Sequence, residues 1–397
     1  MAATRQSTMT PGSRYFADFH IHVGRSKDQP VKMAAARNLT VEAVLREARE
    51  RKGLDIITLI DGVCTNVLSE LTELVAQGRL RELAGGGYEF ENGLTVFIGS
   101  EVEIGGPSGG AAHFGCWFPT LSSATDFHGW LTTVQTNPSL SSQRARTDAY
   151  TLQNETTGRG GLFIVHHAFT PHKGIYGNCV SRLTEMVDMT LVDALELGLS
   201  ADSDMADCLS ELKDITFISN SDAHSAAKIA REYNALFVHA PTFEEVGLAL
   251  HRQRGRFVAA NFGLHPALGK YHRSRCAKCG KFWEVQSVGC SCGSTRSVIG
   301  VYDRLLQIRD TDVPAHPKHR PPYHYQVPLE FVPGLGPKSL TRLLDEFGTE
   351  MVVLNQVQVD ALAAVVGEQL AGLIHRSRSG DVQFLEGGGG VYGKIIL

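Results

Sequence analysis

The chain has 397 residues, of which 43% are hydrophobic and 20% charged, and its formal net charge at pH 7 is −4. This length and composition predict two or three globular domains with a sizeable core. No apolar run approaches the roughly 18 residues that a membrane-spanning helix needs, so we expect no such helix and no contact with a membrane.

The first segment, residues 1–14, is polar and has no apolar signal core. We expect it to be a disordered tail, on a protein that is cytoplasmic and associated with the nucleoid.

From residue 15 to residue 265, short apolar segments alternate with segments of helical character. Repeated alternation of strand and helix predicts a parallel sheet or a barrel. The expected helices are residues 40–51, 66–83, 143–157 and 243–254, the first with Thr40 as N-cap. The expected strands are RYFADFHI, LDIITLI, LTVFIGSEVEI, HFGCWF, GLFIVHH, LVDALEL, ITFISNSD and FVAA.

Acids and histidines mark the ends of most of these strands. In the stretch ADFHIH, Asp18, His20 and His22 are two residues apart and would share one face of a strand. They form either a buried polar cluster or the first part of a metal site. The later strands carry Asp61, Glu101, His113, His166, His167, Glu196, Asp222 and His224. Because barrel enzymes collect catalytic groups from the ends of several strands, we expect these side chains to converge.

Imidazole nitrogens and carboxylate oxygens are ligands for borderline and hard divalent ions. Two or three such ions close together can activate water and stabilise the leaving oxygen of a phosphate ester. Glu101, which follows the apolar LTVFIGS, would suit a bridging position. The pattern therefore predicts hydrolysis of a phosphomonoester or phosphodiester, with Zn, Mn and Mg all open as the catalytic metal.

Charge is distributed unevenly along the chain. Residues 1–251 carry 20 Lys and Arg against 30 Asp and Glu, residues 252–330 carry 13 against 5, and residues 331–397 carry 5 against 7. An acidic body beside a basic segment indicates a catalytic domain next to a polyanion-binding one, although the basic residues could instead solvate a linker.

The basic segment contains four clustered cysteines, spaced C-x2-C, ten residues and C-x-C. Thiolates at this spacing predict a closed tetrahedral zinc site of structural type, formed by Cys276, Cys279, Cys290 and Cys292. Lys278 and Lys281 lie within this module and are candidates for contacts with DNA phosphates.

Residues 327–348, VPLEFVPGLGPKSLTRLLDEFG, are similar to a helix-hairpin-helix element. Its glycine turn would present backbone N–H groups to a phosphate, and Lys338 would add charge; the alternative is an ordinary turn between packed helices. We therefore divide the chain into a tail (1–14), a catalytic barrel (15–265), a zinc-binding module (266–300) and a C-terminal DNA-binding region (301–397).

The order of the motifs DFHIH, IDG, GSEVE, HF, VHHAFTPH and SDAH resembles the polymerase and histidinol phosphatase (PHP) family over roughly residues 14–265. The resemblance implies an α/β fold, a distorted (βα)7 barrel with a trinuclear metal centre at the carboxyl ends of its strands. It also implies the metal ligands His20, His22, Glu101, His113, His167, Asp222 and His224. Asp18 would be an orienting acid or a ligand.

Two positions depart from that family. Its usual TDH is IDG here, residues 60–62, so one ligand histidine is missing, and either Asp61 substitutes or a third metal binds differently. His166 and His167 are adjacent, and because neighbours on a strand point to opposite faces, we expect one of them, His167, to face the metals. The residues assigned to catalysis are Asp18, Asp61, Asp222 and His224.

The segment FTPHKGIYGNC, together with HIHVGRS and the cysteine cluster, resembles the endonuclease Q family over nearly the whole chain. This resemblance implies a DNA repair hydrolase that nicks DNA 5′ to hypoxanthine, uracil or xanthine and at abasic sites. The substrate could be double- or single-stranded, with a repair or replication clamp as a candidate partner. Arg25, His172 and Lys173 would contact phosphates, and Phe114, Trp117, Phe169 or Tyr176 could stack on a flipped base.

Two other functions fit part of the pattern. A small-molecule phosphatase would explain the barrel but would leave the basic segment, the zinc module and the hairpin without a role. A non-catalytic DNA-binding scaffold with a degenerate metal site is permitted by the IDG substitution.

Overall fold

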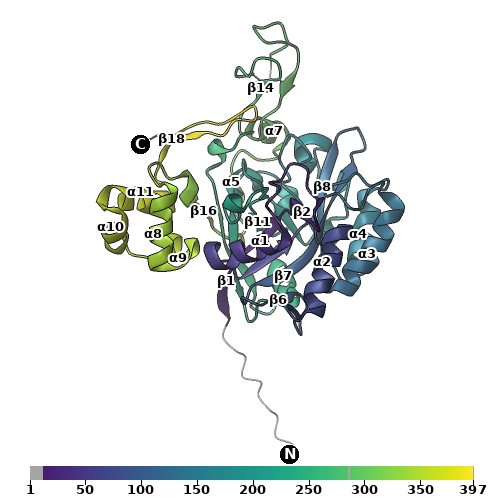
Figure 1. The fold of residues 1–397 in the computed structure, drawn as a ribbon. Coiled ribbons are helices and arrows are strands. Elements are labelled where there is room, and N and C mark those ends of the chain that lie inside the picture. Colours follow the sequence, from purple (N-terminus) through teal and green to yellow (C-terminus); the bar gives the residue numbers. More distant parts are fainter. Residues whose placement is uncertain (1–11, 285–286, 397) are drawn as a thin grey trace, which may run out of the picture.

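The computed structural model describes residues 12–284 and 287–396 (Figure 1). Most of the expected tail, residues 1–11, lies outside the described residues. Ser13 and Arg14, however, already belong to strand β1 (Ser13–Ile21), where they pair with Val238 and Phe237. The expected tail was therefore two residues too long, because an antiparallel partner extends the first strand.

Seven strands form the wall of a barrel, in the order β1, β4, β7, β8, β9, β10 and β11. Their bounds beyond β1 are β4 (Ile56–Leu59), β7 (Thr95–Gly105), β8 (Ala111–Phe118), β9 (Leu162–Val165), β10 (Ala194–Glu196) and β11 (Phe217–Ile218). The backbone after β11 closes the ring, since Ala223 N–H donates to His20 O at 3.2 Å and His22 N–H to Ala223 O at 3.1 Å. The predicted distorted (βα)7 barrel is thus confirmed, and antiparallel β8 is one source of its distortion.

Further strands extend the sheet outward from β1. They are β12 (Tyr233–Val238), β13 (Phe257–Gly263) and β16 (Tyr323–Tyr325), and β5 (Leu80–Glu82) and β6 (Tyr88–Phe90) form a short hairpin on β7. Because β16 pairs with β13, the C-terminal part of the chain contributes a strand to the barrel sheet. The domain boundaries at residues 265 and 300 stay predictions.

Helices cover the outside of the barrel: α1 (Val41–Arg46), continued by a π-helix (Glu47–Lys52), α2 (Thr65–Ala76), α3 (Leu121–Val134), α4 (Ala149–Thr157), α5 (Ser203–Ala206) and α6 (Phe243–Leu250). Thr40 caps α1 as predicted, with Ala43 N–H donating to its hydroxyl at 3.2 Å. The helix expected over 66–83 ends at Ala76, because Gly78 has a φ of +73° and the chain then enters β5. The helix expected over 143–157 begins only after its N-cap, Asp148.

The remaining segments form two units beside the barrel (Figure 1). One carries β14 (Arg275–Cys276) and β15 (Ser297–Val298), followed by α7 (Val301–Ile308). The other is a helical unit of α8 (Pro337–Phe347), α9 (Glu350–Asn355), α10 (Val359–Val366) and α11 (Glu368–Ser379). The final hairpin, β17 (Gln383–Leu385) and β18 (Lys394–Ile396), runs between these two units. No described helix is both long and apolar enough to cross a membrane.

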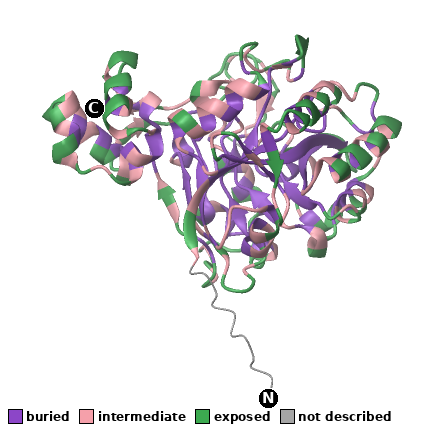
Figure 2. Cartoon of the chain, turned by 60° about the horizontal axis from the view of Figure 1, so that its bottom comes forward, coloured by how far each residue is buried: buried purple, intermediate pink, exposed green. Residues whose placement is uncertain are grey.

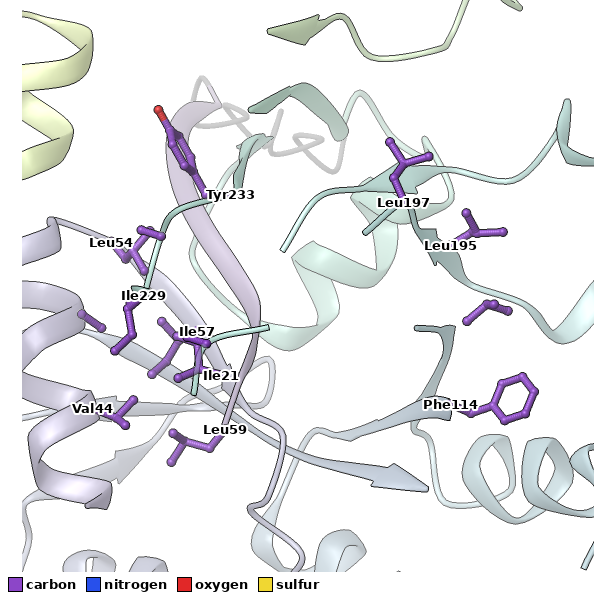
Figure 3. Packing of buried hydrophobic residues seen from close by; sticks show 14 of the residues in the cluster. Ile21, Val44, Leu54, Ile57, Leu59, Phe114, Leu195, Leu197, Ile229 and Tyr233 are labelled. Atoms are coloured by element: carbon purple, nitrogen blue, oxygen red, sulfur yellow. The ribbon is translucent and has the colours of Figure 1, made fainter. Parts of the chain in front are cut away.

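Buried residues follow the strands, with exposed residues on the outer helix faces (Figure 2). An apolar layer between strands and helices includes Ile21, Ile57 and Leu59 with Val44 of α1 (Figure 3). A second cluster contains Phe19, Phe97 and Trp117. The centroid of the Phe19 ring lies 6.3 Å from that of Phe97 and 4.9 Å from that of Trp117.

Glu232 gives the fold a testable dependence on pH. Its side chain is fully buried, with Leu264 N–H donating to Oε1 at 3.0 Å, and burial raises its pKa from 4.5 to about 8. The folded state therefore keeps a proton that the unfolded state has lost, so stability should fall as pH rises from about 4.5 to about 8.

We expect Glu232→Gln to remove this dependence, because glutamine keeps the acceptor and carries no charge. Thermal unfolding of both proteins from pH 5 to pH 9 should show wild type losing up to about 1.4 kcal/mol per pH unit relative to the variant. Parallel curves for the two proteins would contradict a protonated Glu232.

Candidate metal centre

Glu101, on β7, stands at the centre of a cluster of histidines. Its Oε2 atom lies 3.3 Å from His20 Nε2, 3.1 Å from His113 Nδ1, 3.3 Å from His166 Nδ1 and 3.3 Å from His167 Nε2. One carboxylate oxygen has too few lone pairs to accept hydrogen bonds from four rings. A cation placed between these nitrogen and oxygen atoms would relieve the crowding.

Asp222 organises a second set of donors. Its Oδ1 atom lies 3.3 Å from His22 Nε2, 3.6 Å from His20 Nε2 and 3.4 Å from His224 Nε2. Asp222 has a φ of +46°, a left-handed conformation that is strained for a residue with a side chain. The surrounding structure must therefore hold this turn in place.

The geometry fits divalent metal ions. Within the described residues, and apart from the cysteines, three groups have ligand atoms within 4.8 Å of one another: His20, Glu101 and His166; His20, His22 and Asp222; Glu101, His113 and His167. His20 belongs to two of these groups, and so does Glu101. In the same part of the chain, the buried atoms His166 Nε2 and His224 Nε2 make no hydrogen bond. Buried imidazole nitrogens without partners, next to carboxylates, are the donor set of a zinc, manganese or iron type site.

The two histidines of the HIH motif are held by carboxylates behind them. His20 Nδ1 lies 2.9 Å from Glu196 Oε2, and His22 Nδ1 lies 3.1 Å from both oxygens of Asp61. Each pairing turns the Nε2 atom toward the cluster, as in carboxylate–histidine–metal arrangements. Asp61 therefore orients the His22 ring. The sequence assigned no role to Glu196, although its place at the end of a strand was the available signal.

Charges in the cluster are arranged for binding cations. Burial would raise the pKa of Glu101, but His113 and Lys32 outweigh it and hold that pKa well below its usual range. Burial lowers the pKa of His166 and of His224 to about 4, so both rings are neutral and carry a free lone pair. Burial would lower the pKa of His20 and of His113, but Glu196 and Glu101, respectively, outweigh it and raise both values, so a metal ion that binds these two rings would displace protons.

His166 and His167 both face Glu101. The expectation that one of the pair points away was wrong, because β9 ends at Val165 and His167 has a φ of +25°. The alternation of a strand no longer applies there, so consecutive rings reach the same carboxylate oxygen.

Asp18 belongs to none of the metal-sized groups among the described residues. Its carboxylate accepts backbone N–H groups of Ser221 at 3.1 Å and Ala230 at 3.0 Å. The same carboxylate also accepts the backbone N–H of His20 at 3.3 Å. Its observed contacts tie β1 to the loop that carries Asp222.

Lys32 is a further member of the site that the sequence did not indicate. Its ammonium lies 3.0 Å from Glu101 Oε1 and also donates to Ser142, whose hydroxyl contacts the same carboxylate oxygen. No motif carries Lys32, because its role arises from a contact between residues 69 positions apart.

A cavity of about 210 Å³ opens over the cluster. Its rim is cationic and aromatic, with His172, Lys173, Arg231, Lys270 and Tyr271 among its lining residues. Lys173 also pairs with Glu103 Oε2 at 2.6 Å, and the His172 ring packs edge-on against Tyr271 at 5.2 Å between centroids. The cavity thus combines a metal-binding floor with a rim suited to phosphate.

Comparisons with known proteins match almost the whole chain. The crystal structure of a lesion-specific endonuclease, PfuEndoQ from Pyrococcus furiosus, superposes with a TM-score of 0.84 and 31% identity, covering 97% of this chain and 96% of that one. The chain belongs to the endonuclease Q family. A structure of endonuclease Q in complex with a 27-mer duplex with an abasic lesion at the active site matches equally well, at a TM-score of 0.84, 31% identity and 97% coverage of both chains.

Sequence relatives extend this family without adding a function. The uncharacterized protein YqxK of Bacillus subtilis (strain 168) is 44% identical over 96% of this chain and 99% of its own length. An uncharacterized protein of Methanocaldococcus jannaschii is 34% identical over 58% of this chain but only 31% of its own length. No family model matches the sequence.

The four clustered cysteines of this endonuclease Q homologue converge as the spacing predicted. Cys276 Sγ lies 3.7 Å from Cys292 Sγ, and Cys279 Sγ lies 3.5 Å from Cys290 Sγ. All four sulfur atoms are within 4.8 Å of one another, which fits one tetrahedral metal ion.

The residues expected to contact DNA are scattered around the molecule. His172 and Lys173 line the cavity, whereas Arg25 lies in a small hairpin and donates to Asp28 O at 2.8 Å. Lys278 and Lys281 are exposed beside the cysteines, and Lys338 is exposed in the first turn of α8.

The four aromatics considered for base stacking, Phe114, Trp117, Phe169 and Tyr176, are all buried in the core. Tyr271 is the aromatic residue that lines the cavity instead.

Proposed function

We propose that this protein is a metal-dependent DNA endonuclease of repair, which hydrolyses the phosphodiester 5′ to a deaminated base or at an abasic site. The observation that carries the proposal is the convergence of six histidines on Glu101 and Asp222 beneath a cavity with a cationic rim. Membership of the endonuclease Q family supports DNA as the substrate, since relatives with 31% identity are a lesion-specific endonuclease and a complex with an abasic duplex.

The ligands we propose are His20, His22, Glu101, His113, His166, His167, Asp222 and His224, which would hold two or three ions of Zn, Mn or Mg. Bound there, such ions would supply an activated water and positive charge for the phosphate. Glu196 and Asp61 keep the two HIH rings in the orientation that presents Nε2. Lys32 neutralises part of the charge of Glu101 from the opposite side.

The rim would position the nucleic acid. Lys173 and Lys270 offer ammonium groups to phosphates next to the scissile bond, and His172 offers a ring nitrogen. The cavity over the cluster would receive a base turned out of the duplex, and Tyr271 lies where that base could stack. Turning a nucleotide out of the duplex costs the least free energy at mispaired and abasic positions. This difference favours damaged DNA over intact DNA as the substrate.

The two accessory units would extend the contact with DNA. The cysteine module would bind a structural zinc ion and bring Lys278 and Lys281 to the backbone. The turn before α8, with Gly334 at a φ of +83°, would direct backbone N–H groups and Lys338 toward a phosphate. A clamp protein remains a proposed partner.

The test is a nicking assay on a labelled duplex with one deoxyinosine, supplied with Mg²⁺ or Mn²⁺, beside uracil, abasic and undamaged duplexes and a nitrophenyl phosphate ester. We expect one cut 5′ of each lesion and no cut in undamaged DNA, with activity lost in Asp222→Asn. Ester hydrolysis with intact DNA would instead indicate a phosphatase. Salt-sensitive DNA binding without hydrolysis would indicate a scaffold.

A further inference from the structure

One guanidinium group contacts both carbonyls of the turn that carries Asp222. Arg231 Nε donates to Ser221 O at 2.7 Å and its Nη2 donates to Asp222 O at 3.2 Å, so the fork spans two consecutive carbonyls. Asp222 has a φ of +46°, and a strained conformation persists only where neighbouring contacts fix it. Arg231 is 9% exposed, so it is a buried charge whose remaining N–H groups also need partners.

The third contact of Arg231 comes from the far end of the chain. Arg231 Nη1 donates to the Tyr392 hydroxyl at 2.9 Å, across 161 positions of sequence. Tyr392 stands just before β18, and its ring lies 5.9 Å from Lys270 Nζ and 6.4 Å from the Phe331 ring. Tyr392 therefore lies between the segment that follows β13 and the segment that precedes α8.

The glycine run before Tyr392 brings this part of the chain close to the backbone of residues 267–270. Gly387 N–H donates to Ala267 O at 2.7 Å, Gly390 N–H to Lys270 O at 2.9 Å and Gly393 N–H to Leu268 O at 2.9 Å. A Cβ on Gly387 would lie 2.3 Å from Gly269 O, so a side chain would push the two backbones apart. The run FLEGGGGVYG is thus the means by which Tyr392 is fixed against the active-site wall.

We propose that Arg231 and Tyr392 are positioning residues of the catalytic centre, with Tyr392 fixing the guanidinium fork that holds the Ser221–Asp222 turn. The proposal rests on the proposed metal-dependent function. It gives the C-terminal hairpin a role in catalysis that is separate from any contact with DNA.

The test compares Tyr392→Phe with Tyr150→Phe. Tyr150 is a matched control, because its hydroxyl also makes one hydrogen bond, to Thr184 O at 3.1 Å, and it lies on α4 away from the cavity. Losing one hydrogen bond to a charged group should lower kcat on an abasic duplex about fivefold to tenfold. The KM for that duplex should stay within about twofold, because the variant removes no phosphate contact.

A second readout does not depend on turnover. Titration with Mn²⁺ alone should show weaker binding in Tyr392→Phe, by about the same factor as kcat, with wild-type affinity in Tyr150→Phe. In an Arg231→Lys background, where the fork is already lost, Tyr392→Phe should have no further effect on either quantity.

Three results would overturn the proposal. The first is an unchanged kcat and Mn²⁺ affinity in Tyr392→Phe. The second is a loss of kcat and Mn²⁺ affinity in Tyr150→Phe equal to that in Tyr392→Phe. The third is a double variant in which the effects of Tyr392→Phe and Arg231→Lys on these quantities are fully additive. If wild type itself nicks no DNA, the proposed function fails. Mn²⁺ titrations of wild type, Tyr392→Phe, Arg231→Lys and the double variant still decide whether Tyr392 acts through Arg231.

Discussion

Glu101→Gln is expected to reduce nicking of an abasic duplex by about 10³-fold or more. Glu101 Oε2 faces four imidazoles and Oε1 faces Lys32, so this carboxylate serves two of the metal-sized groups directly. Glutamine keeps the shape but loses the charge, and its amide group would direct N–H toward rings that need an acceptor or a cation. Bound metal, measured by elemental analysis after dialysis, should fall in parallel with the rate.

The control for this variant is Glu350→Gln. Glu350 is also a buried carboxylate paired with a lysine, Lys52, at 2.9 Å, but it joins α9 to the π-helix outside the site. Loss of a buried ion pair should destabilise both variants, whereas only Glu101→Gln should lose metal and nicking activity. Equal loss of activity in both would mean that Glu101 matters for stability alone.

Asp61→Asn is expected to lower kcat and metal affinity about 10- to 100-fold through the tautomer of His22. Asp61 accepts from Val23 N–H at 2.7 Å and faces His22 Nδ1 at 3.1 Å. If the amide oxygen of asparagine keeps the bond to Val23, its NH₂ group takes the other position, also 3.1 Å from Nδ1, where it repels a proton on that nitrogen. The proton of the ring then moves to Nε2, which can no longer donate a lone pair to a metal.

Asp193→Asn provides a matched control for that tautomer argument. Asp193 likewise accepts a backbone N–H, from Phe163 at 2.6 Å, and pairs with a histidine, His251, at 2.7 Å. It lies just before β10, whereas Glu196, which contacts the cluster, ends that strand. Nicking and Mn²⁺ affinity should be normal in Asp193→Asn. Normal values in Asp61→Asn as well would show that His22 does not need Asp61 to present Nε2.

The kind of site and most of its members were decided by the sequence. Most of these acids and histidines stood at or near the end of an apolar segment, and because the carboxyl ends of barrel strands meet at one rim, convergence followed from the order of elements alone. The cysteine spacing likewise determined its own cluster, since four thiols within seventeen residues are close neighbours whatever the surrounding fold.

Only the tertiary structure decided the orientation of each group and its supporting contacts. Asp18 accepts the backbone N–H groups of Ser221 and Ala230, and the end of β9 lets His166 and His167 face one carboxylate. Lys32 and Tyr392 reach the site across 69 and 161 positions, respectively. Strand periodicity extends over a few residues, so no local pattern can report a breakage of register or a contact between distant segments. Those features depend on how the closed barrel brings separate parts of the chain together.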